Sequence, residues 1–215
     1  MIRRHFISAA ALAIATGLPL SGAFAQPGAG PKVLILGDSL SAEYGLKRGE
    51  GWVALLEKRL AKEKIPARIV NASISGETTA GGRSRLNALL TQHKPDTVVI
   101  ELGGNDALRG LPVAQTQANL AAMVDAAKVS GAEVLILGIQ VPPNYGMAYL
   151  NSFSKIFASV ATTSKVPVVP FMLRGVADGP DAAAMFQPDR IHPVAAAHPR
   201  ILDNVWPELK KLIAQ

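Results

Sequence analysis

Five short apolar segments, separated by stretches long enough for helices, constrain the fold of this chain most strongly. The segments read as strands and lie at residues 32–36, 68–71, 96–102, 133–137 and 167–171. The stretches between and after them carry apolar residues at helical spacing, at about 51–64, 79–92, 115–130, 147–165 and 193–213. Since strands joined by helical crossovers cannot pair as hairpins, they should run parallel with right-handed connections. The sequence therefore predicts an α/β fold, a three-layer α/β/α sandwich around a five-stranded parallel sheet.

The first 25 residues have the pattern of a secretory signal peptide. Arg3 and Arg4 precede an apolar stretch from about residue 6 to residue 20, and Ala23-Phe24-Ala25 resembles a small-residue cleavage site. That stretch is shorter than the roughly 20 residues that cross a bilayer, which favours a cleaved signal over a retained membrane anchor. The arginine pair is compatible with both Sec and twin-arginine export.

This pattern sets the expected organisation of the chain. We expect a signal peptide at residues 1–25, a flexible leader at 26–31 and one domain at 32–215. The domain should be secreted or periplasmic, without a stable membrane anchor, and we expect a monomer.

Composition excludes several classes of function. The chain has 22 basic and 16 acidic residues and no cysteine, so disulfides, thiolate catalysis and Cys-ligated zinc are ruled out. The basic residues form no block with interleaved aromatics, and no His, Asp and Glu residues have metal-ligand spacing. We therefore expect no nucleic-acid partner, no metal and no cofactor.

The segment from Lys32 to Ser41 ends the first strand abruptly at a glycine and then delivers a serine. Gly37 allows a sharp turn, so the next side chains project from the carboxyl edge of the sheet, where open α/β folds bind their ligands. Ser39 is therefore the candidate nucleophile. An ordinary strand end, with Asp38 or Ser39 capping a helix, explains this segment equally well when it is taken alone.

Two further glycine-rich turns follow the second and third strands, at residues 71–77 and 103–106. All three turns should meet at one edge of the sheet. Late in the chain, Asp189 and His192 lie three residues apart, a spacing that puts both on one side of a helical turn. His198 is a rival base, but only His192 has an acid three residues before it.

These residues can perform the chemistry of a serine triad. Ser39 would attack an ester or thioester carbonyl, His192 would accept and return the proton, and Asp189 would orient the imidazole. The backbone N–H groups of Ser39 and Gly76 and the Asn105 amide would stabilise the oxyanion. Both positions also have a simpler interpretation. Gly76 could be needed only for its backbone conformation, and Asn105 could serve only to cap a turn.

Two acidic residues near these positions have structural interpretations. Asp38 should brace the nucleophile turn through its carboxylate. Asp106 should pair with Arg109, three residues later.

Taken together, the four blocks resemble the SGNH hydrolases of the GDSL esterase/lipase group. The family is named for a Ser, a Gly, an Asn and a His, which fall here in order on Ser39, Gly76, Asn105 and His192. Longer runs look like the multifunctional thioesterase, lysophospholipase and arylesterase members. The resemblance implies a flavodoxin-like sheet of order 2-1-3-4-5 and a serine hydrolase acting on aryl esters, acyl-CoA and lysophospholipid-type substrates.

Substrate preference is less evident. Apolar residues in the loops beside the site are candidates for an acyl-chain groove, namely Leu108, Leu111, Pro112, Pro143 and Tyr145, although they could equally be loop packing. Glu43 and Arg190 stand where close relatives often have glycine, which bears on chain-length preference. A carbohydrate O-acetyl esterase and a non-catalytic phosphate- or nucleotide-binding module are the alternative functions.

Overall fold

The computed structural model describes residues 30–141 and 145–214. The predicted signal peptide, residues 26–29 of the predicted leader and the candidate Pro143 lie outside the described residues. Within the described residues, no helix combines the length and the apolar character needed to cross a bilayer.

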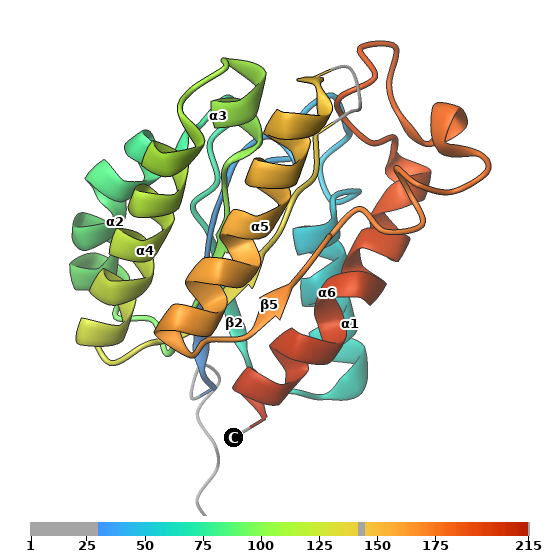
Figure 1. Ribbon diagram of the computed structural model, residues 1–215. Helices are drawn as coiled ribbons and strands as arrows, with labels where there is room; N and C mark the ends of the chain where they lie inside the picture. Colours follow the sequence, from blue (N-terminus) through green and yellow to red (C-terminus); the bar gives the residue numbers. More distant parts are fainter. Residues whose placement is uncertain (1–29, 142–144, 215) are drawn as a thin grey trace, which may run out of the picture.

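The core of the molecule is a parallel sheet of five strands in the order β2-β1-β3-β4-β5 (Figure 1). The strands are β1 (Lys32–Gly37), β2 (Arg68–Asn71), β3 (Thr97–Glu101), β4 (Glu133–Leu137) and β5 (Val168–Val169). All four neighbouring pairs run parallel. The predicted fold class and strand order are therefore confirmed.

The last strand is shorter than the sequence predicts. Only Val168 and Val169 pair with β4, whereas the apolar segment extends from Pro167 to Phe171. Proline has no N–H to donate to a ladder, so Pro167 and Pro170 limit the strand at both ends.

Helices cover both faces of the sheet, as Figure 1 shows. Helices α2 (Thr79–His93), α4 (Val113–Val129) and α5 (Met147–Ser164) lie side by side on one face, and α1 (Trp52–Glu63) and α6 (His198–Ile213) cover the other. Short helices stand in the loops: α3 (Gly104–Leu108), η2 (Ala182–Met185) and η3 (Ala195–Ala197).

Two of these helices differ from the sequence prediction. The segment after β3 was expected to be a glycine-rich loop, but it begins with helix α3, whose first turn contains Asp106. A carboxylate there complements the positive end of the helix. The final helix begins at His198 rather than near Pro193, because the 3₁₀ turn η3 precedes it and Pro199 occupies its first turn.

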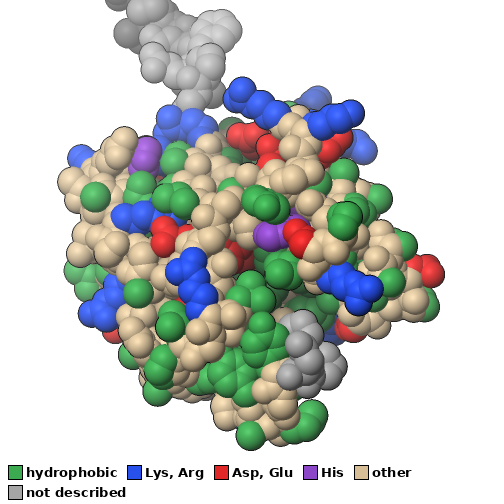
Figure 2. Space-filling model, turned by 90° about the horizontal axis from the view of Figure 1, so that it is seen from above, with side chains coloured by type: hydrophobic (Ala, Val, Ile, Leu, Met, Phe, Trp, Pro, Cys, Tyr) green, Lys and Arg blue, Asp and Glu red, His purple; other side chains and the backbone are tan. Residues whose placement is uncertain are grey.

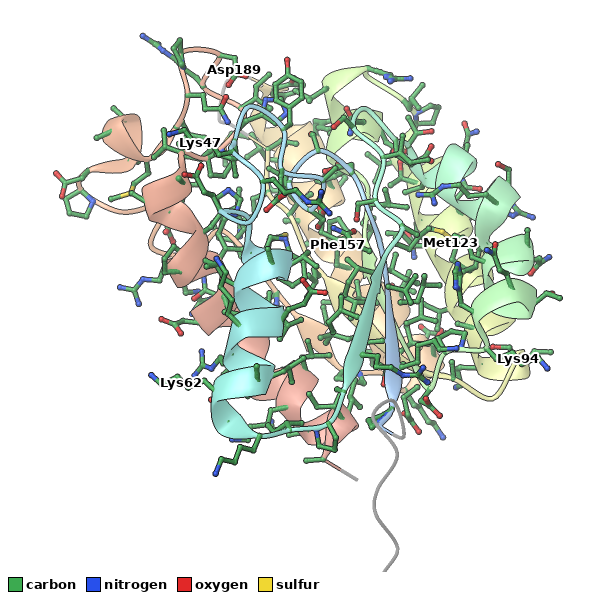
Figure 3. The ribbon with its side chains drawn as sticks, turned by 180° about the vertical axis from the view of Figure 1, so that it is seen from behind. Lys47, Lys62, Lys94, Met123, Phe157 and Asp189 are labelled. Carbon is green, nitrogen blue, oxygen red and sulfur yellow. The ribbon has the colours of Figure 1, made fainter. Side chains whose placement is uncertain are left out.

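The strands form the centre of the hydrophobic core, which explains their nearly continuous apolar sequence. The side chains with no exposed surface include Val33, Leu34, Ile35, Leu36, Val98, Val99 and Ile100. Truncating one such side chain to alanine typically costs about 2–5 kcal/mol. A sheet held this firmly fixes the turns at its carboxyl edge. Figure 3 shows Asp189 at that edge and Lys62 and Lys94 at the opposite end.

Candidate active site

The nucleophile turn requires a glycine at its first position. A Cβ added at Gly37 would lie 2.8 Å from a Glu101 carboxylate oxygen and 2.8 Å from Ser41 Oγ, closer than real Cβ contacts. Beyond the glycine, Asp38 Oδ1 accepts the Leu40 N–H at 3.0 Å. Asp38 therefore braces the turn, as predicted, and Ser39 follows with most of its surface buried.

A buried pair of carboxyl groups lies behind this turn. Glu101 Oε2 accepts the Asp38 N–H at 3.2 Å and the Ser41 hydroxyl at 2.7 Å, and Ser41 Oγ in turn accepts the Trp52 indole N–H at 3.1 Å. Asp38 and Glu101 are both buried, each with a relative exposure of 2 %.

Burial controls the charge of this pair. It raises the pKa of Asp38 to about 6, against hydrogen bonds from Leu40 and Asn105 that lower it. Burial also raises the pKa of Glu101 well above its usual range, and the nearby Asp38 carboxylate raises it further. Sequence reasoning missed Glu101, although an acidic residue at the end of a buried apolar strand is an unusual placement and a usable signal.

The Ser39, His192 and Asp189 side chains form a continuous hydrogen-bonded chain. His192 Nε2 lies 2.8 Å from Ser39 Oγ, and His192 Nδ1 lies 2.7 Å from Asp189 Oδ2. Because an ionised carboxylate can only accept, the proton belongs on Nδ1, which leaves Nε2 to accept the serine proton. The fold thus brings the three predicted side chains together, although Ser39 and His192 are 153 positions apart in the sequence.

Asp189 and His192 do not lie on a helical turn, contrary to the sequence prediction. Arg190 between them has φ 59°, in the left-handed region that interrupts a helix. Asp189 Oδ1 instead accepts the N–H groups of Ile191 at 2.9 Å and His192 at 3.0 Å. The Asp189 carboxylate therefore reaches the His192 ring from a non-helical loop and not from the helical turn that the sequence predicts.

Hydrogen bonding keeps the Asp189 carboxylate ionised. Partial burial works against the charge, but the bonds from the backbone and ring of His192 and from the Ile191 N–H outweigh it. They lower the pKa of Asp189 to about 2.

Two residues beside the histidine were missed by sequence reasoning. The Tyr44 ring lies against the His192 ring, with centroids 4.2 Å apart. Gln187 Nε2 donates to the Tyr44 carbonyl at 2.9 Å and to the Pro193 carbonyl at 3.1 Å. Gln187 thus joins the loop after β1 to the loop that carries His192, a pairing for which the sequence holds no spacing signal.

The three predicted oxyanion donors have protons available. Asn105 Nδ2 donates one hydrogen to Asp38 Oδ2 at 2.9 Å, which orients the amide and leaves its second hydrogen free. Among the described residues, the Ser39 and Gly76 N–H groups have no hydrogen-bond partner. Unpaired N–H groups are what a preorganised oxyanion site requires.

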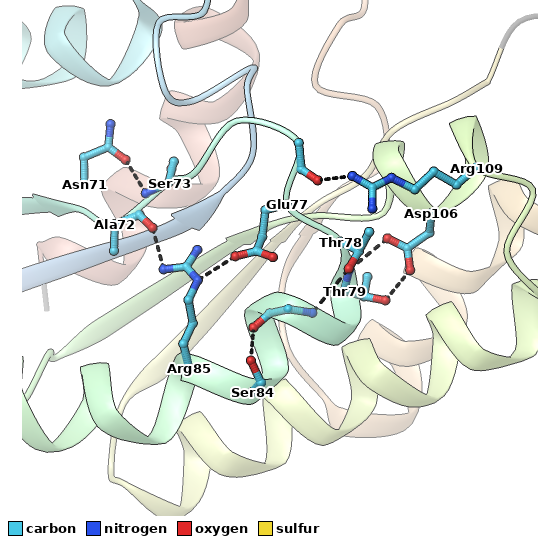
Figure 4. Close-up of polar contacts among 12 residues, drawn as sticks. Asn71, Ala72, Ser73, Glu77, Thr78, Thr79, Ser84, Arg85, Asp106 and Arg109 are labelled. Carbon is cyan, nitrogen blue, oxygen red and sulfur yellow. Dashed lines mark hydrogen bonds and ion pairs between the residues drawn. The ribbon is translucent and has the colours of Figure 1, made fainter.

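Asp106 and Arg109 do not pair with each other, so that prediction is wrong. Asp106 is buried and accepts the Thr79 N–H at 2.8 Å and the Thr79 hydroxyl at 2.5 Å (Figure 4). Arg109 Nη2 donates to the Gly76 carbonyl at 2.8 Å. Asp106 in α3 therefore binds the first residue of α2, and Arg109 at the C-cap of α3 binds the loop between β2 and α2.

The rival base His198 is excluded by its position. It is almost fully buried, and its Nδ1 accepts the Trp52 N–H at 3.0 Å at the start of α1. Burial lowers the pKa of His198. In the parts of the chain that the structure describes, no group of three His, Cys, Asp or Glu side chains could hold a metal ion.

Apolar side chains surround the site. Figure 2 shows the carboxyl edge with a histidine and an acidic side chain near its middle and hydrophobic side chains around them. Of the acyl-groove candidates, Leu108 is 42 % exposed, Pro112 is exposed and Leu111 and Tyr145 are half-buried. The centroid of the Tyr145 ring lies 6.0 Å from that of Tyr149 in α5.

Comparison with known proteins shows the family to which this chain belongs. The GDSL-like Lipase/Acylhydrolase family model matches residues 35–200. Esterase TesA of Pseudomonas aeruginosa is 54% identical over 201 residues, which cover 91% of this chain and 98% of the relative. Thioesterase 1/protease 1/lysophospholipase L1 of Escherichia coli K12 is 42% identical over 181 residues, covering 84% of each chain.

A solved structure shares the fold. The crystal structure of TesA superposes with a TM-score of 0.81 at 56% identity, covering 84% of this chain and 99% of that one. The family model spans most of this chain, and the two relatives match it over 98% and 84% of their own length. The chain therefore belongs to the GDSL-like lipase/acylhydrolase family, whose members include the SGNH hydrolases that its four motifs resemble.

Proposed function

We propose that this ester-hydrolysing enzyme works through an acyl-enzyme on Ser39, with His192 as general base and acid and Asp189 as its orienting carboxylate. The observation that carries the proposal is the unbroken chain from Ser39 Oγ through His192 to Asp189, with separations of 2.8 and 2.7 Å. Such separations are within hydrogen-bond reach for proton transfer.

In the first half-reaction, Ser39 Oγ forms a bond to the carbonyl carbon while its proton moves to His192 Nε2. The negative oxygen accepts hydrogen bonds from the Ser39 and Gly76 N–H groups and from the Asn105 amide. Collapse of this intermediate breaks the ester or thioester bond, and the leaving alcohol or thiol takes the proton from His192.

In the second half-reaction, water repeats the cycle on the acyl group. His192 removes a proton from the water, whose oxygen attacks the acyl carbon, and the proton returns to Ser39 as the carboxylic acid leaves. Asp189 stays ionised throughout, which its pKa of about 2 supports.

The proposed substrates are carboxylic esters and acyl thioesters, including aryl esters, acyl-CoA and lysophospholipid-type molecules. The name of the E. coli relative includes thioesterase and lysophospholipase, and that of the P. aeruginosa relative includes esterase. The exposed apolar side chains of Leu108 and Ile191, both 42 % exposed, support binding of an acyl chain beside the site.

We further propose that the protein acts as a monomer after export and cleavage near Ala25, without a retained anchor. The catalytic groups all come from one chain, and the basic, apolar and small-residue pattern of residues 1–25 supports export. N-terminal sequencing of protein from the periplasmic fraction tests the cleavage site, and size-exclusion chromatography with light scattering tests the monomer.

Labelling with a serine-directed fluorophosphonate tests the nucleophile. We expect stoichiometric modification of Ser39 in the wild type and none in Ser39→Ala of unchanged melting temperature. Unlabelled folded wild-type protein would reject the proposal. A panel of p-nitrophenyl esters and acyl-CoAs of rising chain length then separates the lipid-type enzyme from an O-acetyl esterase, which would accept only the shortest acyl group.

A further inference from the structure

The turn that carries Gly76, residues Ile74–Glu77, has a conformation suited to glycine. Its Glu77 N–H donates to the Ile74 carbonyl at 3.1 Å, and Gly76 at the third position has φ 79°. A positive φ at this position is typical of a type II turn and favours glycine. The turn does not use the Gly76 N–H, which stays available as an oxyanion donor.

This Gly76 turn is poorly supported by packing. The Ile74 side chain is 51 % exposed, and Ser75 is exposed as well. A surface turn with little buried area moves unless polar contacts hold it. Since an oxyanion donor must keep its position within a fraction of an ångström, such contacts are needed here.

Three side chains, those of Arg85, Asp106 and Arg109, anchor the loop around the turn, and Figure 4 shows them together. Arg85 from α2 donates to the Ala72 carbonyl at 2.6 Å and to the Glu77 carboxylate at 2.8 Å. Asp106 from α3 accepts two hydrogen bonds from Thr79. These contacts hold Ala72 before the turn, Glu77 at its end and Thr79 after it.

The third side chain, Arg109, holds Gly76 directly. Arg109, the C-cap of α3, donates from Nη2 to the Gly76 carbonyl at 2.8 Å. The same Nη2 lies 3.7 Å from the point where a Cβ of residue 76 would stand, so the guanidinium is adjacent to the glycine. A hydrogen bond from a charged donor is stronger than a neutral one.

We propose that Arg109 is a positioning residue of the oxyanion hole, fixing the Gly76 turn against the helix that carries Asn105. This inference rests on the proposed function of Gly76 and Asn105 as oxyanion donors. Holding the Gly76 carbonyl restricts rotation about the backbone of that residue and therefore the direction of its N–H. Helix α3 thus supplies one donor through Asn105 and fixes a second through Arg109.

Substitution of Arg109 tests the proposal by separating kcat from KM. Arg109→Gln should lower kcat about 10-fold, less than the roughly 100- to 1,000-fold typical for complete loss of one oxyanion donor. KM should stay within about twofold, because the turn acts on the transition state rather than on ground-state binding. The loss in kcat should be the same for a neutral p-nitrophenyl ester and for the anionic acyl-CoA.

Two variants serve as controls. Arg109→Lys keeps the charge and one donor, so we expect it to recover most of the kcat lost in Arg109→Gln. Arg48→Gln removes the same charge from an exposed residue in the loop after Ser39 and should leave both parameters unchanged. Melting temperatures of all three variants should match that of the wild type within a few degrees.

Several outcomes would overturn the proposal. An unchanged kcat in Arg109→Gln would remove Arg109 from the oxyanion machinery. A loss seen only as a higher KM for acyl-CoA would make Arg109 an anion-binding residue instead. Fluorophosphonate labelling keeps this test separate from the proposed function: failure of wild-type labelling rejects the nucleophile, whereas normal labelling with normal kcat in Arg109→Gln rejects only the positioning role.

Discussion

The two halves of the candidate active site are built in different ways. The half that holds Ser39 and Asn105 follows directly from the central strands β1 and β3, and its supporting carboxyl groups, Asp38 and Glu101, are buried. The half that holds Asp189 and His192 lies in a late loop, where the Asp189 side chain is 36 % exposed. The first half is held rigid by the hydrophobic core. The second half depends on hydrogen bonds within its own loop.

Local hydrogen bonds give the late loop its shape. The Gln187 N–H donates to the His192 carbonyl at 2.8 Å, and Phe186 and Pro193 form an isolated antiparallel bridge. Among the described residues, the hydrogen bonds and ring contacts that tie this loop to the loop of the nucleophile turn are those of Gln187 and His192 with Tyr44 and the bond that Ser39 Oγ makes to His192. The His192 ring is thus placed by a small turn that is held mainly by its own hydrogen bonds.

The same contrast appears in the charges of the two aspartates. Burial raises the pKa of Asp38 to about 6, whereas hydrogen bonds from His192 and Ile191 overcome burial and lower the pKa of Asp189 to about 2. The sheet half therefore tolerates a buried acid that resists ionisation, and the loop half keeps its carboxylate charged beside the His192 ring.

The largest effect should come from the residue that joins the halves. His192→Ala removes the proton acceptor of Ser39, and kcat/KM should fall by about 10,000-fold or more. The melting temperature should change little because the loop is exposed. Steady-state hydrolysis of a p-nitrophenyl ester measures the loss, and a fall below about 100-fold would show that another group serves as base.

Removing a donor from the sheet half should have the next largest effect. Asn105→Ala should lower kcat by about 100- to 1,000-fold with a small change in KM. Asn105→Asp, a matched variant of nearly equal size, should be at least as damaging because it places a negative charge near the oxyanion. Activity close to that of the wild type in Asn105→Ala would contradict its role as a donor.

Loosening the late loop should have a smaller effect. Gln187→Ala removes the bonds to the Tyr44 and Pro193 carbonyls, and we expect kcat to fall on the order of 10-fold as the imidazole loses its fixed position. Hydrogen exchange of residues 186–193 should become faster, while that of β1 stays unchanged. Equal acceleration in both regions would refute the idea that the halves are supported separately.

The buried acid pair should be visible as a pH dependence of stability. The ordinary pKa of Asp38 is 3.8, and burial raises it to about 6 in the folded state. Between these values the folded protein binds more protons than the unfolded chain, so the free energy of unfolding decreases as the pH rises through this window. The raised pKa of Glu101 extends the loss to higher pH.

Glu101→Gln isolates this contribution, because the amide can still accept hydrogen bonds but has no proton to lose. The unfolding free energy of the variant should therefore fall less steeply than that of the wild type as the pH rises above 4. Urea denaturation at a series of pH values measures this difference. Parallel curves for the two proteins would show that the pair does not control the pH dependence.

Much of the site was predictable because its main residues stand where strands end. The ends of the apolar segments located Ser39, Gly76 and Asn105 at the carboxyl edge, and the three-residue spacing identified Asp189 and His192. The support of these residues was less predictable. In the sequence, Glu101 stands among the other residues of its strand, which does not reveal its contacts with the nucleophile turn. The bond from Arg109 to Gly76 joins residues that are 33 positions apart, a separation for which the sequence has no spacing pattern.

The sequence by itself determined the layered α/β architecture, the order of motifs and the chemical identity of the candidate catalytic groups. It did so because periodicity, strand length and glycine placement act locally along the chain. Only the tertiary structure decided that Gln187 ties the late loop to Tyr44, that Asp106 binds Thr79 rather than Arg109, and that a left-handed Arg190 shapes the Asp189 turn. Those choices depend on distances between segments far apart in the chain, and no local pattern encodes them.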